Sequence, residues 1–171
     1  EFWILDTDSG AVVQQIAASS SARFPTWSPA GGEIAYVTIE QGQTSIWRMA
    51  LGGGQPVLLA GSASENYAPS WSPDGQWIAF QSNLDSANSE IWVMDREGGS
   101  LRRVTDTPAG YWSRAPSFSP DGGWLAYVSD QAGSVGADYG EVFVVSLESG
   151  EARQVTQTGG GVYDWRVNWG R

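Results

Sequence analysis

The chain has 171 residues, 41% of them hydrophobic, which suits a packed domain and argues against a disordered segment. Nine basic residues, all Arg, stand against nineteen acidic ones, and the net charge of −10 disfavours nucleic acid and anionic lipid as partners. No apolar run approaches the roughly 20 residues that span a bilayer, so no membrane insertion is expected. Without His, Cys or Lys, we expect no catalytic activity, no metal site and no cofactor.

The first 22 residues predict two strands, Phe2–Asp6 and Val12–Ala17. Between them, the sequence DTDSG at 6–10 resembles the start of a calcium loop. Position 12 of such a loop would be Ala17 rather than an acidic ligand. The segment also aligns with hairpin turns later in the chain, so we predict a turn here. Because the chain begins beside a strand-like run, we expect it to be part of a longer protein.

A seven-residue motif then recurs along the chain. It reads PTWSPAG at 25–31, PSWSPDG at 69–75 and PSFSPDG at 116–122, and a truncated copy, VNWG, lies at 167–170. The aromatic residue of the motif falls at Trp27, Trp71, Phe118 and Trp169, with spacings of 44, 47 and 51 residues. Three further short strand-like runs, separated by polar or Gly-bearing turns, follow each full copy.

Four short antiparallel strands in a repeat of about 40–50 residues are typical of a β-propeller blade. We therefore predict an all-β propeller of about fourteen or fifteen strands, with three full four-stranded blades at 23–66, 67–114 and 115–164. Residues 1–22 supply the last two strands of a further blade and 165–171 its first, so this blade is split and lacks a second strand. Large aromatic residues should be buried between blades: Trp27, Trp47, Trp71, Trp92, Phe118 and Phe143.

The split blade leaves three arrangements open. The chain is the C-terminal part of a six- or seven-bladed propeller, or it closes alone as a thin four-bladed ring, or two copies complete one larger ring. Open sheet edges invite pairing, which favours a ring completed by another chain over an isolated open arc. We therefore expect a homo-oligomer, with Arg166–Trp169 pairing as an inner strand with the blade that contains Phe2–Asp6.

The order of the motifs resembles the repeat of TolB-like β-propellers, with PSWSPDG followed by IAF, IWVMD, Gly-Gly and RRVT. The same repeat occurs in the propellers of tricorn-type and prolyl-oligopeptidase-type proteins. The resemblance covers nearly the whole chain and implies a non-catalytic module that binds a protein or peptide partner in the periplasm or at the cell surface. The alternative that it implies is the accessory propeller of a larger hydrolase, which filters or positions substrate for an active site elsewhere.

Connections from the outer strand of one blade to the inner strand of the next should lie on one face around the central opening. Arg or an aromatic residue stands four positions before each motif aromatic. In the last two copies a further aromatic residue, Trp112 or Tyr163, lies two positions before that residue. Such residues are typical interface anchors, although they also suit blade junctions or a plugged opening. The candidate partner-binding residues are Arg23, Tyr67, Trp112, Arg114, Tyr163, Asp164 and Trp165.

Two other features have structural explanations beside the functional ones. The Gly runs at 52–54 and 159–161 lack the Lys-Ser/Thr of a phosphate-binding loop, so a turn and a loop are predicted. The longest departure from the repeat, residues 130–140, is either a binding loop containing Tyr139 or a tolerated insertion at a loop tip.

Overall fold

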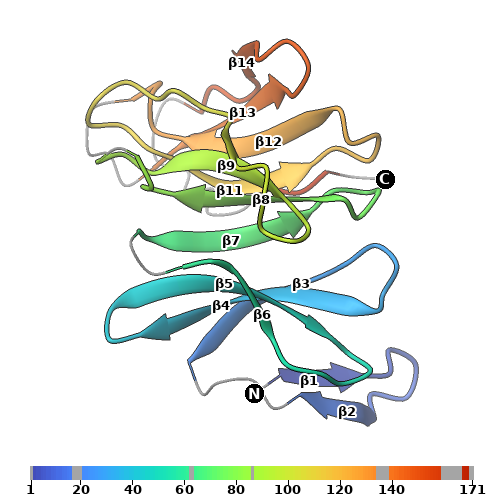
Figure 1. Cartoon of the computed structure of the whole chain (residues 1–171). Coiled ribbons are helices and arrows are strands. Elements are labelled where there is room, and N and C mark those ends of the chain that lie inside the picture. The colour runs from blue at the N-terminus through green and yellow to red at the C-terminus, as the bar shows by residue number, and fades with distance from the viewer. Residues whose placement is uncertain are drawn as a thin grey trace.

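The computed structural model describes residues 2–16, 21–61, 64–85, 87–133, 139–158 and 167–169. Within these residues all regular elements are β-strands, and no helix there is long and apolar enough to cross a membrane. Fourteen strands form four antiparallel sheets, which succeed one another from the N-terminus at the bottom of Figure 1 to β14 at the top. The predicted all-β propeller architecture is confirmed.

The first sheet, which we call the half-blade, contains β1 (Phe2–Leu5) and β2 (Val12–Ile16). The first blade contains β3 (Ala22–Trp27), β4 (Glu33–Glu40), β5 (Gln43–Ala50) and β6 (Val57–Ala60). The second contains β7 (Asn66–Trp71), β8 (Trp77–Ser82), β9 (Glu90–Asp95) and β10 (Arg102–Arg103). The third contains β11 (Ser113–Phe118), β12 (Trp124–Ser129), β13 (Glu141–Ser146) and β14 (Ala152–Gln154). In every sheet, consecutive strands are neighbours.

The repeated motif forms the tight turn between the first two strands of a blade. Between β7 and β8, Ser72 Oγ donates to Asp74 Oδ1 at 2.5 Å and accepts from Trp77 N at 2.9 Å. Ser119 and Asp121 repeat the first contact between β11 and β12, also at 2.5 Å. These serine hydroxyls stabilise the ionised carboxylates and lower the pKa of Asp74 and of Asp121. The motif therefore fixes where each hairpin begins.

The blades are held together by apolar contacts between their faces. Between the first and second blades, Ile46 and Met94 are buried in one cluster with Trp71. Between the second and third blades, Ile91 and Phe118 belong to an equivalent cluster. In each cluster the motif aromatic comes from the inner strand of the later blade and covers the blade before it. Burial of this residue therefore depends on a complete preceding blade.

Trp27 shows this dependence. Its side chain is 50% exposed, whereas Trp71 is 7% and Phe118 8% exposed. The sheet that precedes Trp27 has only two strands, so part of the surface that would cover the indole is missing. The burial prediction is correct for Trp71, Trp92, Phe118 and Phe143, while Trp47 is partly buried and the prediction for Trp27 is wrong.

A charged cluster adds a second tie between the first and second blades. Glu33 accepts from Arg48 Nη1 at 2.8 Å and from Arg96 Nη2 at 2.7 Å, and Arg48 Nη2 contacts Glu97 Oε2 at 2.6 Å. The Arg48 and Glu33 side chains are both largely buried, so solvent screens this pair less than the pair of Arg48 with the exposed Glu97. The second blade is thus attached to the first by both apolar and ionic contacts.

Residues 167–169 lie against the third blade. Trp169 Nε1 donates to the carbonyl of Ser117 at 3.0 Å. Trp169 shares a groove with Trp124, as Phe118 shares one with Trp77 in the preceding blade. Trp169 therefore occupies the motif position that follows the third blade. Among the described residues β1 pairs with β2 alone, so pairing of this segment with β1 of the same chain is not found there; Arg166 lies outside them.

We predict that Trp71→Ala and Phe118→Ala each lower the free energy of unfolding by about 3–5 kcal/mol, because each leaves a large cavity between two blades. Trp27→Ala should cost less than about 2 kcal/mol, because half of that side chain is already in water. Urea unfolding followed by circular dichroism measures all three. An equal loss at position 27 would contradict the assigned blade order.

Candidate partner-binding site

The inner strands β3, β7 and β11 line an open cavity of about 540 Å³. Its aromatic walls are Phe24, Tyr67 and Trp112, and Arg114 and Gln81 supply polar groups. Val167, near the C-terminus, also lines the cavity. Three prolines, one from each inner strand, complete the apolar surface: Pro25, Pro69 and Pro116.

The prolines sit at a bulge that is repeated in all three inner strands. The residue before each proline has a left-handed backbone, with φ of 52° at Phe24, 50° at Ala68 and 52° at Ala115. The register with the second strand shifts at the same place in each blade. A non-glycine residue in this conformation costs about 1–3 kcal/mol, so the surrounding fold must impose it three times. The bulges turn the backbone at the cavity wall.

The structure brings together three of the predicted site residues. Tyr67, Trp112 and Arg114 all line the cavity, whereas Arg23 does not, and its Nη1 donates to the carbonyl of Ala22 at 2.8 Å. Tyr163, Asp164 and Trp165 lie outside the described residues, as does the Gly run at 159–161. Sequence reasoning missed Phe24 and Gln81 as cavity residues. The position before the first proline of each full motif copy is the signal that marks Phe24.

Two aromatic contacts organise the cavity walls. Phe24 and Tyr67 meet edge to face, with ring centroids 6.3 Å apart and an interplanar angle of 87°. On the opposite inner strand the Arg114 guanidinium lies over the Trp112 ring, 4.4 Å from its centroid. The Phe24–Tyr67 contact joins the first and second blades, whereas Arg114 and Trp112 lie two residues apart at the start of the third blade.

The backbone of Trp112 is held by hydrogen bonds to Asp130 and Ser129. The backbone N–H of Trp112 donates to Asp130 Oδ1 at 2.6 Å, and Ser129 Oγ donates to the Trp112 carbonyl at 2.7 Å. Asp130 is 1% exposed, and burial raises its pKa; the Trp112 hydrogen bond and the nearby Arg114 charge partly oppose this shift.

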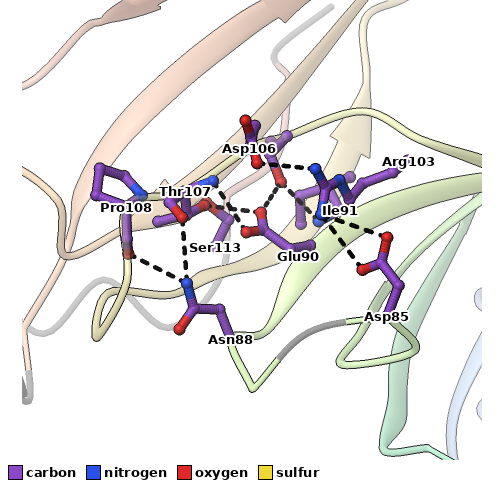
Figure 2. Close-up of polar contacts among 10 residues, drawn as sticks. Asp85, Asn88, Glu90, Ile91, Arg103, Asp106, Thr107, Pro108 and Ser113 are labelled. Atoms are coloured by element: carbon purple, nitrogen blue, oxygen red, sulfur yellow. Dashed lines mark hydrogen bonds and ion pairs between the residues drawn. The ribbon is translucent and has the colours of Figure 1, made fainter.

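A buried carboxylate holds the connection that leads to Trp112 (Figure 2). Glu90 accepts from Thr107 N at 2.9 Å, from Thr107 Oγ1 at 2.8 Å and from Thr105 Oγ1 at 2.5 Å. Thr107 Oγ1 also contacts Ser113 Oγ at 2.8 Å, and Asn88 Nδ2 donates to the Thr107 carbonyl at 3.1 Å. The third blade repeats the arrangement with Glu141, Thr156 and Thr158. We call this set of hydrogen bonds between a buried Glu and two Thr residues the latch. Its sequence signal is a Glu that opens the third strand of a blade, together with T-x-T after the fourth.

The calcium-loop-like segment and the first Gly run both form turns. Asp6 lies in the turn between β1 and β2, where Oδ1 accepts from Ser9 N at 2.8 Å. Gly53 lies in a turn after β5, with φ of 104°. In the part of the chain that the structure describes, no group of three or more acidic side chains is placed to hold a metal ion.

We predict that Glu90→Gln lowers the free energy of unfolding by about 1–3 kcal/mol, because the amide replaces charge-assisted hydrogen bonds and turns a donor toward the Thr hydroxyls. Glu148→Gln, at an exposed turn of the third blade, is the matched control and should change it by less than about 0.5 kcal/mol. Thermal unfolding at neutral pH measures both. If both variants unfold like the parent, Glu90 is not a latch.

The family model of the TolB beta propeller domain matches residues 1–169, nearly the whole chain. The chain belongs to the TolB beta propeller domain family. Its structure is similar to that of a putative TolB from Agrobacterium tumefaciens, with a TM-score of 0.68 and 28% identity, over 78% of this chain and 48% of that one. A prolyl endopeptidase structure shares the fold at 16% identity, with a TM-score of 0.61, over 90% of this chain and 24% of that one.

Two sequence relatives are similar over about half of this propeller chain. An uncharacterized protein of Agrobacterium fabrum is 34% identical over 86 residues, which are 50% of this chain and 29% of that protein. The uncharacterized peptidase YuxL of Bacillus subtilis is 32% identical over 101 residues, or 56% of this chain and 15% of that protein. The chain therefore spans less than a third of the length of either relative.

Proposed function

We propose that this TolB-family chain is a non-catalytic module that binds a protein or peptide partner in the cavity between its inner strands. The observation that supports this proposal is the grouping of Tyr67, Trp112 and Arg114 on one cavity. Among the described residues, no carboxylate lies within ion-pair distance of the Arg114 guanidinium, which rests on the Trp112 ring. An aromatic wall with an available guanidinium is the composition of an interface hot spot.

The rigidity of the cavity favours a peptide segment as its occupant. The three bulges and the latch at Glu90 hold the walls in place before a partner arrives, so little ordering entropy is lost on binding. A volume of about 540 Å³ accommodates a few side chains of a protruding loop or chain end. We further propose, from the family relationship, that the chain acts outside the cytoplasm, in the periplasm or at the cell surface.

Selection of peptides from a random displayed library against the immobilised chain tests this proposal. We expect Trp112→Ala and Arg114→Ala each to weaken binding of the selected peptides at least tenfold, because each removes an anchor of the cavity. Arg102→Ala removes an exposed charge from β10, away from this cavity, and should leave the affinity unchanged. Fluorescence anisotropy measures the dissociation constants. Selected peptides that bind all four proteins equally would place the partner elsewhere.

The alternative is an accessory propeller that filters or positions substrate for a hydrolase. The relationship to the peptidase YuxL and the fold shared with a prolyl endopeptidase support it. On this alternative the cavity still binds peptide, but the ligand is a substrate of a catalytic domain. A displayed-peptide hit that is cleaved when the same propeller is part of a longer parent protein would favour the alternative; an uncleaved one favours the binding module.

We also propose that a second copy of the chain completes the half-blade. Three large apolar side chains are exposed at this end of the molecule, with exposed fractions of 56% for Trp3, 55% for Leu5 and 50% for Trp27. The β1 edge that faces away from β2 has no strand partner among the described residues. An uncovered apolar sheet of this kind associates readily with another sheet. The segment around Trp169 supplies the inner-strand motif that the half-blade lacks.

Light scattering tests the self-association. We expect the mass to be a multiple of the 18.3 kDa of one chain, and we expect deletion of residues 164–171 or the change Trp27→Asp to reduce it. Leu84→Asp, at another exposed apolar side chain, is the control and should keep the parent mass. A parent chain that runs as a stable monomer, with a melting temperature unaffected by the deletion, would contradict this proposal.

A further inference from the structure

The second and third blades can be compared position by position, because their strand registers match. Arg103 lies opposite Trp92 in the second blade, and Gln154 lies opposite Phe143 in the third. Thr107 N donates to Glu90 as Thr158 N donates to Glu141. Arg103 and Gln154 are therefore equivalent, and so are Asp106 and Gln157, which lie three residues further on.

In the second blade an arginine pairs with two carboxylates in this region (Figure 2). Arg103 Nη2 contacts Asp106 Oδ1 at 2.8 Å, and its Nη1 lies 3.3 Å from Asp85. The guanidinium thus bridges the loop after β8 and the segment after β10. Next to it, Asn83 accepts a hydrogen bond from Glu65 N at 2.7 Å through its side-chain oxygen.

In the third blade the arginine and both of its acidic partners are replaced. Gln154 stands for Arg103, Gln157 for Asp106 and Ala132 for Asp85. A cavity of about 400 Å³, which we call the blade-3 pocket, lies here instead. Its lining includes these three residues together with Asp130, Tyr139 and Glu141.

Asp130 makes the blade-3 pocket acidic. It takes the place of Asn83 and accepts from Trp112 N at 2.6 Å, as Asn83 accepts from Glu65 N. Its other carboxylate oxygen, Oδ2, is buried and has no hydrogen-bond partner among the described residues. A buried carboxylate oxygen without a partner is costly, and the chain supplies no arginine at position 154 to compensate for it. At these positions the third blade therefore lacks one arginine and two exposed or partly exposed carboxylates, and it has gained one buried carboxylate, that of Asp130.

We propose that the blade-3 pocket binds a guanidinium group carried by an external ligand, in the place that Arg103 occupies in the second blade. A guanidinium fits because its planar N–H groups match carboxylate oxygens such as Asp130 Oδ2. Gln154, Gln157 and Tyr139 line the same pocket, and Gln154 Nε2 donates to the carbonyl of Thr156 at 2.7 Å, so the amide oxygen of Gln154 remains as an acceptor. The net charge of −10 raises the local concentration of cationic ligands.

The blade-3 pocket is distinct from the cavity between the inner strands, but Asp130 connects the two. Its Oδ1 holds the backbone of Trp112, whose side chain lines that cavity. A guanidinium on Oδ2 keeps the carboxylate ionised and so strengthens its hydrogen bond to Trp112 N. A partner that places an arginine in the blade-3 pocket would therefore also stabilise the aromatic wall of the first cavity.

Nuclear magnetic resonance titration with N-acetyl-arginine amide tests the proposal, with the uncharged analogue N-acetyl-citrulline amide as control ligand. In the parent chain we expect saturable shifts of the Gln154 and Gln157 side-chain amides and of the Trp112 backbone amide with the arginine ligand alone. Equal shifts with both ligands, or no saturation, would overturn the proposal.

Two variants make the test specific. Asp130→Asn reproduces the residue of the second blade and keeps an acceptor for Trp112 N, while Gln154→Arg restores the arginine; both should lose the saturable response. Glu148→Gln removes an exposed carboxylate from the same blade and should retain it. If Asp130→Asn still binds the arginine ligand with the parent affinity, the guanidinium does not contact Asp130 and the proposal fails.

The burial of Asp130 also predicts a pH-dependent stability. Because burial raises the pKa of Asp130, the folded chain binds this proton more tightly than the unfolded chain does. The buried, ionised Asp130 lowers the free energy of unfolding at pH values above its folded pKa. This loss of stability is relieved as the pH falls through the folded pKa. Asp130→Asn should therefore raise the melting temperature at pH 7, and the gain should shrink in acid. A lower melting temperature for this variant at pH 7 would show that the chain itself neutralises Asp130, which would overturn the proposal.

Discussion

The sheets of this chain stack face to face, and the first and second blades each contribute to an apolar cluster on both faces. Each motif aromatic comes from the inner strand of one blade, and Trp71 and Phe118 pack against the blade before their own. Where the preceding blade is complete, as for Trp71 and Phe118, the side chain is buried. Where it has only two strands, as before Trp27, the indole remains half in water. Stability is therefore a property of adjacent pairs of blades.

Stacking of this kind also forms the cavity that we propose as the binding site. The cavity wall has one inner strand from each blade, so no blade contains a site by itself. Tyr67 lies in β7 and Arg114 in β11, and their separation is set by the apolar cluster between the second and third blades. The latch at Glu90 then sets the path of the connection that carries Trp112. Core packing and site geometry are thus controlled by the same contacts.

The repeat allowed the fold and most of the strands to be predicted, because its turn residues and aromatic spacing act locally. Burial of Trp27 was not predictable in this way, since it depends on strands outside its own blade. Tyr67, Trp112 and Arg114 could be predicted as candidates that lie together, because they deviate from the repeat at a fixed place, and all three line the cavity. The blade-3 pocket could not be predicted from the sequence, because it lies where the third blade lacks the arginine and the two carboxylates of the second blade. The absence of an arginine at position 154 is informative only by comparison with the second blade, where the equivalent Arg103 forms ion pairs.

The prolines of the inner strands decide how a ligand can approach. Each blade presents its inner strand as a free sheet edge toward the opening, and such an edge normally recruits an added strand through its N–H and C=O groups. Pro25, Pro69 and Pro116 carry no N–H, and the left-handed residue before each one breaks the regular spacing of the remaining groups. A ladder of main-chain hydrogen bonds cannot extend along these edges. A ligand bound in the proposed cavity would therefore be recognised through side chains, and the same prolines disfavour edge-to-edge association of the inner strands.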